Sequence, residues 1–147
     1  MSEALTAKLV VEQLMRAYAA AARAKDIDAF CAIYTENVRI FDAWDVWEYN
    51  GLNAWREMVT GWFGSLGDES VEVAFEDVRV FPESGDTFAI ASAFVTYSGL
   101  SADGDPLRSL QGRMTWGISQ AGGGWKIVHE HSSSPAIFET GKVSLKR

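Results

Sequence analysis

The sequence predicts an α+β protein in which three N-terminal helices cover a strongly curved, cone-shaped sheet of antiparallel or mixed strands. Two observations support this class. Apolar residues in the first 67 positions recur mainly with the 3.6-residue period of helices, whereas from Glu69 onward they alternate as in strands. Helices followed by strands that are joined through turns are typical of α+β proteins. Bulges that bend such a sheet under its helices produce a cone-shaped cavity.

The N-terminal half contains three predicted helices. The first spans residues 3–24, and its apolar stripe consists of Val10, Leu14, Ala17, Tyr18 and Ala21. A short second helix is expected to begin after the N-cap Asp26 and to end at Asn37, with its inward side formed by Phe30, Ile33 and Tyr34. The third helix follows the turn Asn50-Gly51, ends at Gly64 and Gly67, and has an apolar side formed by Leu52, Trp55, Val59, Trp62 and Phe63.

The remaining segments read as strands and loops. A short strand at 38–42 leads into a loop at 43–50 that is rich in aromatic and acidic residues. Longer strands are predicted at 70–81, 86–98, 108–119 and 125–132, with a loop at 101–106 and a glycine-rich hairpin at 121–124. The alternation shifts phase between Phe75 and Val78, which indicates a bulge. Residues 1–147 are expected to form one domain with a core at about 5–135 and a weakly patterned tail at 136–147, open to fraying.

Composition narrows the classes of function. The net charge is −7 with only 13 Lys and Arg residues and no basic cluster, which argues against nucleic-acid binding. No apolar run approaches the roughly 20 residues of a membrane span, and the N-terminus lacks the pattern of a signal peptide. Cys31 is the single cysteine, so no internal disulfide can form, and we expect a reducing, cytoplasmic location.

The last predicted strand, Gly124–Ser132, carries ionisable groups on both of its sides. Strict alternation places Trp125, Ile127, His129 and His131 on one side, and Val128, Glu130 and Ser132 on the other. Both histidines of the protein lie in this segment. Alternation alone leaves open which side faces the interior.

The order of elements, together with several short motifs, resembles a known superfamily. The motifs are Trp-x-Ile-Val-His-x-His at 125–131, Pro135, Gly51-Leu52 before the third helix, and Ile90-Ala91. Over roughly residues 5–135 the chain resembles the nuclear transport factor 2-like superfamily, and within it the SnoaL-like group and the association domain of calcium/calmodulin-dependent protein kinase II. This superfamily contains isomerases, cyclases, hydrolases, dehydratases, oligomerisation modules and binding proteins, so the fold does not give the function.

The resemblance implies a hydrophobic cavity in place of a charged one. It directs Val128, Glu130 and Ser132 inward, and His129 and His131 outward. The positions that hold cationic groups in the kinase association domains correspond here to Trp55, Phe94, Met114 and Ser132. The implied pocket for a compact hydrophobic molecule is lined by Tyr18, Phe41, Trp55, Phe63, Phe94, Met114 and Val128, with polar groups from Tyr18, Asp42, Glu130 and Ser132.

Three residues are candidates for acid/base chemistry in this pocket. Glu130 in an apolar cavity should have a raised pKa, unless it faces solvent or pairs with Arg113 or Arg108. Asp42 is a candidate second carboxylate, as superfamily isomerases use a pocket aspartate, although aspartates also cap turns. Tyr18 is a candidate hydrogen-bond donor, or a core residue with its hydroxyl at the rim.

Neither a metal nor a cofactor is expected. His129 and His131 have a spacing found in metal sites, but the sequence supplies no signature for a third ligand. The leading hypothesis is a pocket protein with cofactor-free isomerase-, cyclase- or dehydratase-like chemistry. The alternative is a non-catalytic ligand-binding or dimerisation module. In either case we expect a homodimer that forms through the outer face of the sheet, including Trp125, His129 and His131.

Overall fold

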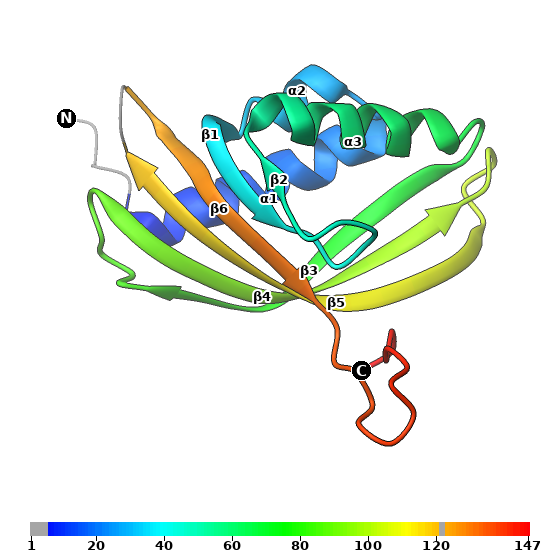
Figure 1. Cartoon of the computed structure of the whole chain (residues 1–147). Coiled ribbons are helices and arrows are strands. Elements are labelled where there is room, and N and C mark those ends of the chain that lie inside the picture. Colours follow the sequence, from blue (N-terminus) through cyan, green and yellow to red (C-terminus); the bar gives the residue numbers. More distant parts are fainter. Residues whose placement is uncertain (1–5, 121–122) are drawn as a thin grey trace.

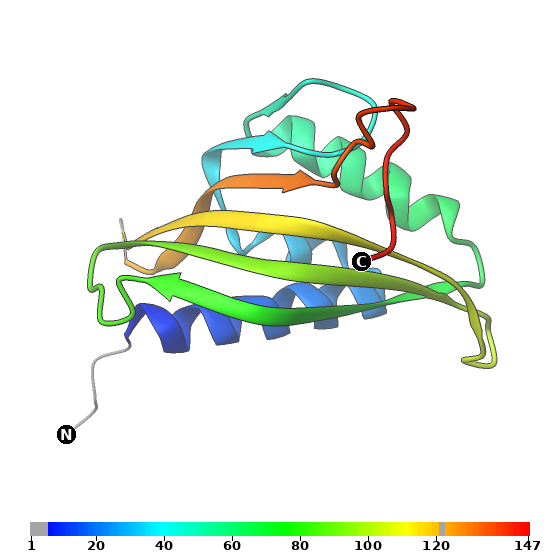
Figure 2. The same ribbon diagram turned by 90° about the horizontal axis from the view of Figure 1, so that it is seen from below.

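The computed structural model describes residues 6–120 and 123–147, and it shows three helices beside a curved sheet. The elements in chain order are α1 (Ala7–Ala24), α2 (Ile27–Cys31), β1 (Tyr34–Phe41), β2 (Tyr49–Asn50), α3 (Leu52–Ser65), β3 (Ser70–Phe81), β4 (Phe88–Leu100), β5 (Pro106–Gln120) and β6 (Trp125–Ser133). The strands form one six-stranded sheet in the order β2-β1-β6-β5-β4-β3. The helices lie on its concave side (Figures 1 and 2), and the sheet is curved without closing on itself. The predicted α+β class is confirmed.

The sheet is mixed because its first long strand runs parallel to its last. β1 pairs in parallel with β6, whereas every other neighbouring pair is antiparallel. In the pairing of β3 with β4 the register shifts between Glu76 and Arg79, which confirms the bulge expected from the phase shift in this strand. Such irregularities let the long strands bend around the helices.

Helix α1 ends at Ala24 as predicted, whereas residues 3–5 of the predicted helix lie outside the described residues. The Thr6 hydroxyl accepts the backbone N–H of Leu9, and the C-cap residue Lys25 has a left-handed backbone with φ of 54°. The Lys25 ammonium then donates to the carbonyl oxygens of Gly67 and Glu69, so the helix end is tied to the start of β3. Ala17 is exposed, in contrast to the predicted stripe, and the buried side of the helix is Ala7, Val10, Val11, Leu14, Met15, Tyr18, Ala21 and Ala22.

The second helix is shorter than predicted. Asp26 caps it as expected by accepting the N–H of Ala29, but the helix ends at Cys31 and not at Asn37. The residues from Tyr34 onward join β1, where Tyr34 lies opposite Ile127 of β6. Pairing with a strand distant in sequence therefore overrides the local helical pattern.

The C-terminal segment 136–147, which has a weak sequence pattern, contacts β4 and β5. The backbone N–H of Gln111 donates to the carbonyl oxygen of Leu145, and the guanidinium of Arg147 lies 3.9 Å from the ring centroid of Phe94. The segment thus folds back along β5. The predicted hairpin at 121–124 includes residues 121 and 122, which lie outside the described residues. Within the described parts of the chain, no helix has both the length and the apolarity to cross a bilayer.

Candidate functional site

A bulge in β6 decides which side chains of this strand face the interior. The register with β5 shifts between Ile127 and His129, so Val128 is an extra residue. Ile127 and Glu130 are therefore both buried although they lie three positions apart. The prediction that Ile127 shares a side with His129 was wrong, because the two-residue alternation breaks at the bulge.

Glu130 is a buried acid with two fixed hydrogen-bond donors. It is 1% exposed, and its Oε1 accepts the Tyr34 hydroxyl at 2.7 Å and the Trp116 indole N–H at 2.9 Å. No hydrogen bond from residues 6–120 or 123–147 reaches Oε2. Burial raises the pKa of Glu130 to about 7, against the lowering effect of the two donors. Arg113 and Arg108 bind other groups on the sheet, so the alternative of an exposed or arginine-paired Glu130 is excluded.

Two tyrosine hydroxyls lie in the same interior. The hydroxyls of Tyr18 and Tyr97 are 2.7 Å apart, and the Tyr18 ring centroid lies 6.0 Å from that of Trp116. Burial raises the pKa of both tyrosines, and the nearby charge of Glu130 raises it further. Both hydroxyls therefore stay protonated. One of them donates to the other, which leaves one hydroxyl hydrogen available to a ligand.

Asp42 connects the interior with the loop that follows β1. Its Oδ1 accepts the Ser132 hydroxyl at 2.9 Å, and the Ser132 oxygen accepts the backbone N–H of Ala43 at 3.0 Å. Burial raises the pKa of Asp42, while Ser132 and the N–H groups of Ala43 and Trp44 lower it. Asp42 thus caps its own loop. It also lies close enough to Glu130 for its charge to contribute to the raised pKa of that acid.

Besides Tyr18, three of the predicted pocket residues lie inside the fold. Met114, Trp55 and Phe63 are buried, and Phe63 packs edge-on against Phe30 at 5.5 Å. The Trp55 ring contacts that of Tyr34 at a centroid distance of 6.0 Å, and its buried indole N–H has no hydrogen-bond partner among the described residues. The interior is therefore strongly aromatic around the Glu130 carboxyl.

Phe41, Phe94 and Val128 lie on the outer face of the sheet, which corrects their predicted place in the pocket. The Phe41 ring packs against His131 at 5.5 Å, and the Phe94 ring lies under the Arg147 guanidinium. Val128 is half-buried beside the outer surface of Gly117. Ile40 before Phe41 and both neighbours of Phe94 are buried, so alternation turns Phe41 and Phe94 outward, whereas Val128 is the extra residue of the bulge.

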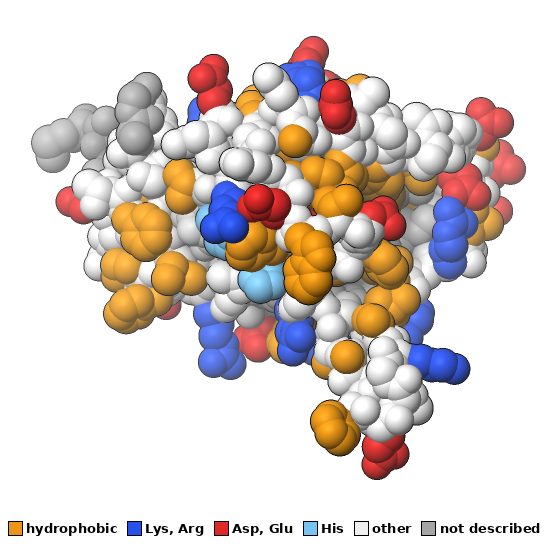
Figure 3. Space-filling view, in the orientation of Figure 1, with side chains coloured by type: hydrophobic (Ala, Val, Ile, Leu, Met, Phe, Trp, Pro, Cys, Tyr) orange, Lys and Arg blue, Asp and Glu red, His pale blue; other side chains and the backbone are white. Residues whose placement is uncertain are grey.

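The two histidines also lie outward, as the resemblance implied. The carbonyl oxygen of Arg39 accepts a hydrogen bond from His129 Nδ1 at 2.7 Å, and the two imidazole centroids are 6.4 Å apart. Both histidines are visible at the surface in Figure 3. Trp125, which was expected beside them, packs against the core. Within the described residues, no three His, Cys, Asp or Glu side chains gather closely enough to hold a metal ion.

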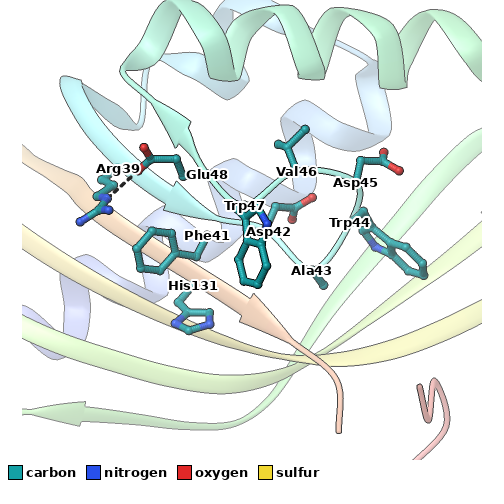
Figure 4. Close-up of a pocket in the computed structure, with 10 residues that line it drawn as sticks. All are labelled: Arg39, Phe41, Asp42, Ala43, Trp44, Asp45, Val46, Trp47, Glu48 and His131. Carbon is teal, nitrogen blue, oxygen red and sulfur yellow. Dashed lines mark hydrogen bonds and ion pairs between the residues drawn. The ribbon is translucent and has the colours of Figure 1, made fainter. Parts of the chain in front are cut away.

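A cleft of about 840 Å³ lies at the surface beside the loop after β1 (Figure 4). It is lined by Arg39, Phe41, Asp42, Ala43, Trp44, Asp45, Val46, Trp47, Glu48 and His131. Asp42 is the one residue that this lining shares with the interior polar groups described above. The protein thus has a buried carboxyl, that of Glu130, and a surface cleft whose lining includes Asp42.

Sequence reasoning missed three residues that contact the candidate acid or its neighbours. Tyr34 was assigned to the core side of a helix, and Trp116 and Tyr97 were not singled out. Trp116 lies opposite Glu130 in the pairing of β5 with β6, so a correct strand register would have found it. No local signal marks Tyr34, because its contact with Glu130 joins residues 96 positions apart.

Solved structures of similar fold have been determined from several bacteria. An NTF2-like protein of unknown function from Pseudomonas putida superposes with a TM-score of 0.82 at 24% identity, covering 96% of this chain and 95% of that one. Aln2 from a Streptomyces species has a TM-score of 0.73 at 15% identity, covering 89% and 93% of the two chains. A calcium/calmodulin-dependent protein kinase II association domain-like protein from Xanthomonas campestris has a TM-score of 0.66 at 16% identity, covering 85% of each chain. At these identities the likeness shows the fold alone.

Sequence comparison is more specific than structural likeness here. A search of curated protein sequences finds no match. The model of the SnoaL-like domain, in contrast, matches residues 11–137, which include every helix and strand from α2 to β6 and most of α1. The chain therefore belongs to the SnoaL-like domain family.

Proposed function

We propose that this protein binds a compact, mostly apolar ligand that carries a carbonyl oxygen, and that Glu130 and Asp42 perform cofactor-free acid/base chemistry on it. The observation that supports this proposal most is the state of Glu130. Its pKa of about 7 keeps much of it neutral at physiological pH, and both donors bind the same oxygen. Since Oε1 accepts two hydrogen bonds, the acid proton resides on Oε2, from which it can be donated to a ligand.

The tyrosine pair supplies a second donor. The free hydroxyl hydrogen of Tyr18 or Tyr97 and the Oε2–H of Glu130 lie in one aromatic interior. A ligand oxygen that accepts both is stabilised more strongly as negative charge develops on it, because the surroundings have a low dielectric. This is the arrangement that enolisation of a ketone requires.

Asp42 is the proposed base. Burial raises its pKa, the hydrogen bonds from Ser132 and from the N–H groups of Ala43 and Trp44 oppose this rise, and the carboxylate form accepts the proton in the proposed step. It removes a proton from the carbon beside the carbonyl, and the electron pair of that C–H bond forms the C=C bond of an enolate whose oxygen is held by Glu130. The C=O π electrons move onto that oxygen, and in a β,γ-unsaturated ketone the enolate is conjugated with the existing C=C bond, so return of the proton to the γ carbon completes an isomerisation. Two carboxyls in different surroundings thus divide into acid and base.

The half-buried side chains suggest the ligand's route. Tyr97, Trp62 and Leu66 are partly exposed yet pack against the core, and the rings of Trp62 and Tyr97 lie 6.1 Å apart. They lie where α3 meets β4, with the Tyr97 hydroxyl directed at Tyr18. Displacement of these side chains by an apolar ligand would bring its polar end to the hydroxyl pair and the Glu130 carboxyl.

Binding of 1-indanone tests the proposed donor, with indane as the matched probe that lacks the oxygen. Indanone should bind more tightly than indane below pH 7, and its affinity should fall as Glu130 ionises above that pH. Glu130→Gln should remove this pH dependence, since the amide does not titrate. Equal affinities for the two probes, or an unchanged pH profile in the variant, would refute the role of Glu130.

Exchange of the indanone α-hydrogens in D₂O, followed by NMR, tests the proposed base. The wild type should accelerate exchange over buffer, and Asp42→Asn should abolish the acceleration while indanone still binds. Binding without any acceleration in the wild type would leave a ligand-binding protein and remove the enzymatic role.

One observation favours a second role as a dimerisation module. An apolar patch lies on the outer face of the sheet, where Phe81 is 78% exposed, Phe88 49% and Ile90 48%. Phe81 lies opposite Ile90 in the register of β3 with β4, and half-buried Val128 extends the patch across Gly117. A second copy of the chain could cover this patch through its own equivalent surface, as in a two-fold dimer.

A further inference from the structure

The cleft beside the loop after β1 has features of a ligand site that the acid/base proposal leaves unused. Its volume of about 840 Å³ lies within the range of small-molecule sites. It opens on the outer side of the sheet, where Phe41 and His131 form part of its wall (Figure 4), whereas Glu130 lies in the interior. The chemistry of its lining therefore requires a separate explanation.

One end of this cleft already holds a cation. The Arg39 guanidinium lies 4.6 Å from the centroid of the Phe41 ring, and its Nε lies 2.8 Å from Glu48 Oε2. The face of an aromatic ring attracts a cation through its quadrupole, and a carboxylate adds a charge interaction. This end shows how the surface accommodates a positive group, namely between an aromatic ring and an acid.

The rest of the cleft also has aromatic rings beside carboxylates, but no Lys or Arg side chain of the described residues lies there. Trp47 lies next to Phe41 and Trp44 lies farther along the loop (Figure 4), and these residues are 96% and 47% exposed, although tryptophan usually buries much of its surface. Asp42 and Asp45 line the same part of the cleft, and no ion pair within residues 6–120 and 123–147 involves either of them. Asp45 adopts a left-handed backbone with φ of 67°, which costs energy for a non-glycine residue.

We infer that this cleft binds a small organic cation, with an alkylated ammonium group held over the Trp47 and Trp44 indoles beside Asp45. An alkylated ammonium suits the site because it presents apolar methyl groups to the indoles and positive charge to the carboxylate. An anionic ligand is disfavoured, since the only cationic side chain in the lining is Arg39, which Glu48 already neutralises. This inference rests on Trp44, Trp47 and Asp45, none of which takes part in the acid/base chemistry proposed above.

Choline and 3,3-dimethyl-1-butanol are a suitable pair of probes, because they have nearly the same shape and differ in charge. Titration into ¹⁵N-labelled protein, followed through the indole N–H signals of Trp44 and Trp47, should give saturable shifts with choline. The alcohol should bind at least about threefold more weakly, the factor expected for one exposed cation–π contact. Choline affinity should fall as salt is raised, since the Asp45 charge is screened.

Two variants test the proposed contacts. Trp47→Leu should weaken choline binding about three- to fivefold, and Asp45→Asn about two- to threefold. The matched controls are Phe138→Leu and Asp103→Asn, which alter an exposed aromatic and an exposed acid outside the cleft and should leave choline binding unchanged. The inference is overturned if choline causes no saturable shift up to about 100 mM, if the alcohol binds equally well, or if the controls weaken binding as much as the cleft variants.

Discussion

Glu130 is held in surroundings that favour its neutral form. The carboxyl is enclosed by aromatic rings, and the energetic cost of removing a charge from water exceeds the benefit of the donors from Tyr34 and Trp116. A buried acid with a raised pKa and specific partners is a candidate for a functional group, in addition to its role as the acceptor for these two donors.

The raised pKa of Glu130 makes the free energy of unfolding depend on pH. In the unfolded chain Glu130 ionises near its ordinary pKa of 4.5, whereas in the folded protein it keeps its proton until about pH 7. Between these values the folded state binds more protons, so stability falls as pH rises, by up to roughly 3 kcal/mol, and the loss is constant above pH 7. Glu130→Gln should flatten this part of the curve, as measured by urea unfolding between pH 4.5 and 7.5.

A control for this measurement is Glu72→Gln, which alters an exposed glutamate of β3. The control variant should retain the pH dependence of the wild type. Part of the slope should also survive in Glu130→Gln, because burial raises the pKa of Asp42 in the same direction. Identical slopes in the wild type and Glu130→Gln would show that Glu130 titrates normally.

At the scale of single residues, the family resemblance placed the polar groups of the interior better than the apolar ones. The acid Glu130, the carboxylate Asp42 and its partner Ser132 were all identified as inward-facing, and the structure brings the last two into contact. Phe41 and Phe94 were wrongly placed, because an apolar side chain on a strand shows no preference between two faces that are both partly covered.

At the scale of elements, β6 and the loop after β1 are joined through one hydroxyl. Ser132 donates to Asp42 and accepts from the backbone of Ala43, so a single side chain fixes both the candidate base and the start of the cleft loop. The boundaries of β3 to β6 were predicted closely from alternation. The bulge at Val128 could not be predicted, since it depends on the register with β5.

Ser132→Ala should loosen the loop after β1. Loss of two hydrogen bonds at a half-buried position should cost about 1–2 kcal/mol locally, so amide exchange at 43–48 should accelerate roughly five- to thirtyfold. The pKa of Asp42 should rise, because the Ser132 hydroxyl lowers it. Hydrogen exchange and a ¹³C titration of Asp42 measure these effects, and Ser134→Ala, whose hydroxyl bonds to the Gln111 carbonyl oxygen, is the matched control. Unchanged exchange in Ser132→Ala would show that the loop is held by other contacts.

At the scale of the whole molecule, helical spacing followed by alternation was enough to predict the α+β class and the curved sheet. These patterns did not predict the parallel pairing of β1 with β6. Because of this pairing, Tyr34 lies in the sheet and not in the predicted second helix. The outer face of the sheet carries the apolar patch of Phe81, Phe88, Ile90 and Val128. We expect this patch to be the dimer interface.

Ile90→Lys should convert the dimer to a monomer, because a charge in the centre of an apolar interface cannot be solvated. Light scattering at micromolar concentration measures the mass, and circular dichroism checks that the variant is folded. Ile137→Lys, which alters an exposed residue of the C-terminal segment, should remain dimeric. A monomeric wild type would contradict the dimer, and a dimeric Ile90→Lys would place the interface elsewhere.

The parallel pairing of β1 with β6 has a consequence for how the protein matures during synthesis. Tyr34 leaves the ribosome well before its partner Glu130, since 96 positions separate them. Until β6 emerges, the nascent β1 strand has an unpaired edge towards the centre of the future sheet, and the carboxyl site does not exist. Nascent chains stalled before residue 125 should therefore be sensitive to proteases and prone to aggregation, and they should depend on chaperones that cover exposed strand edges.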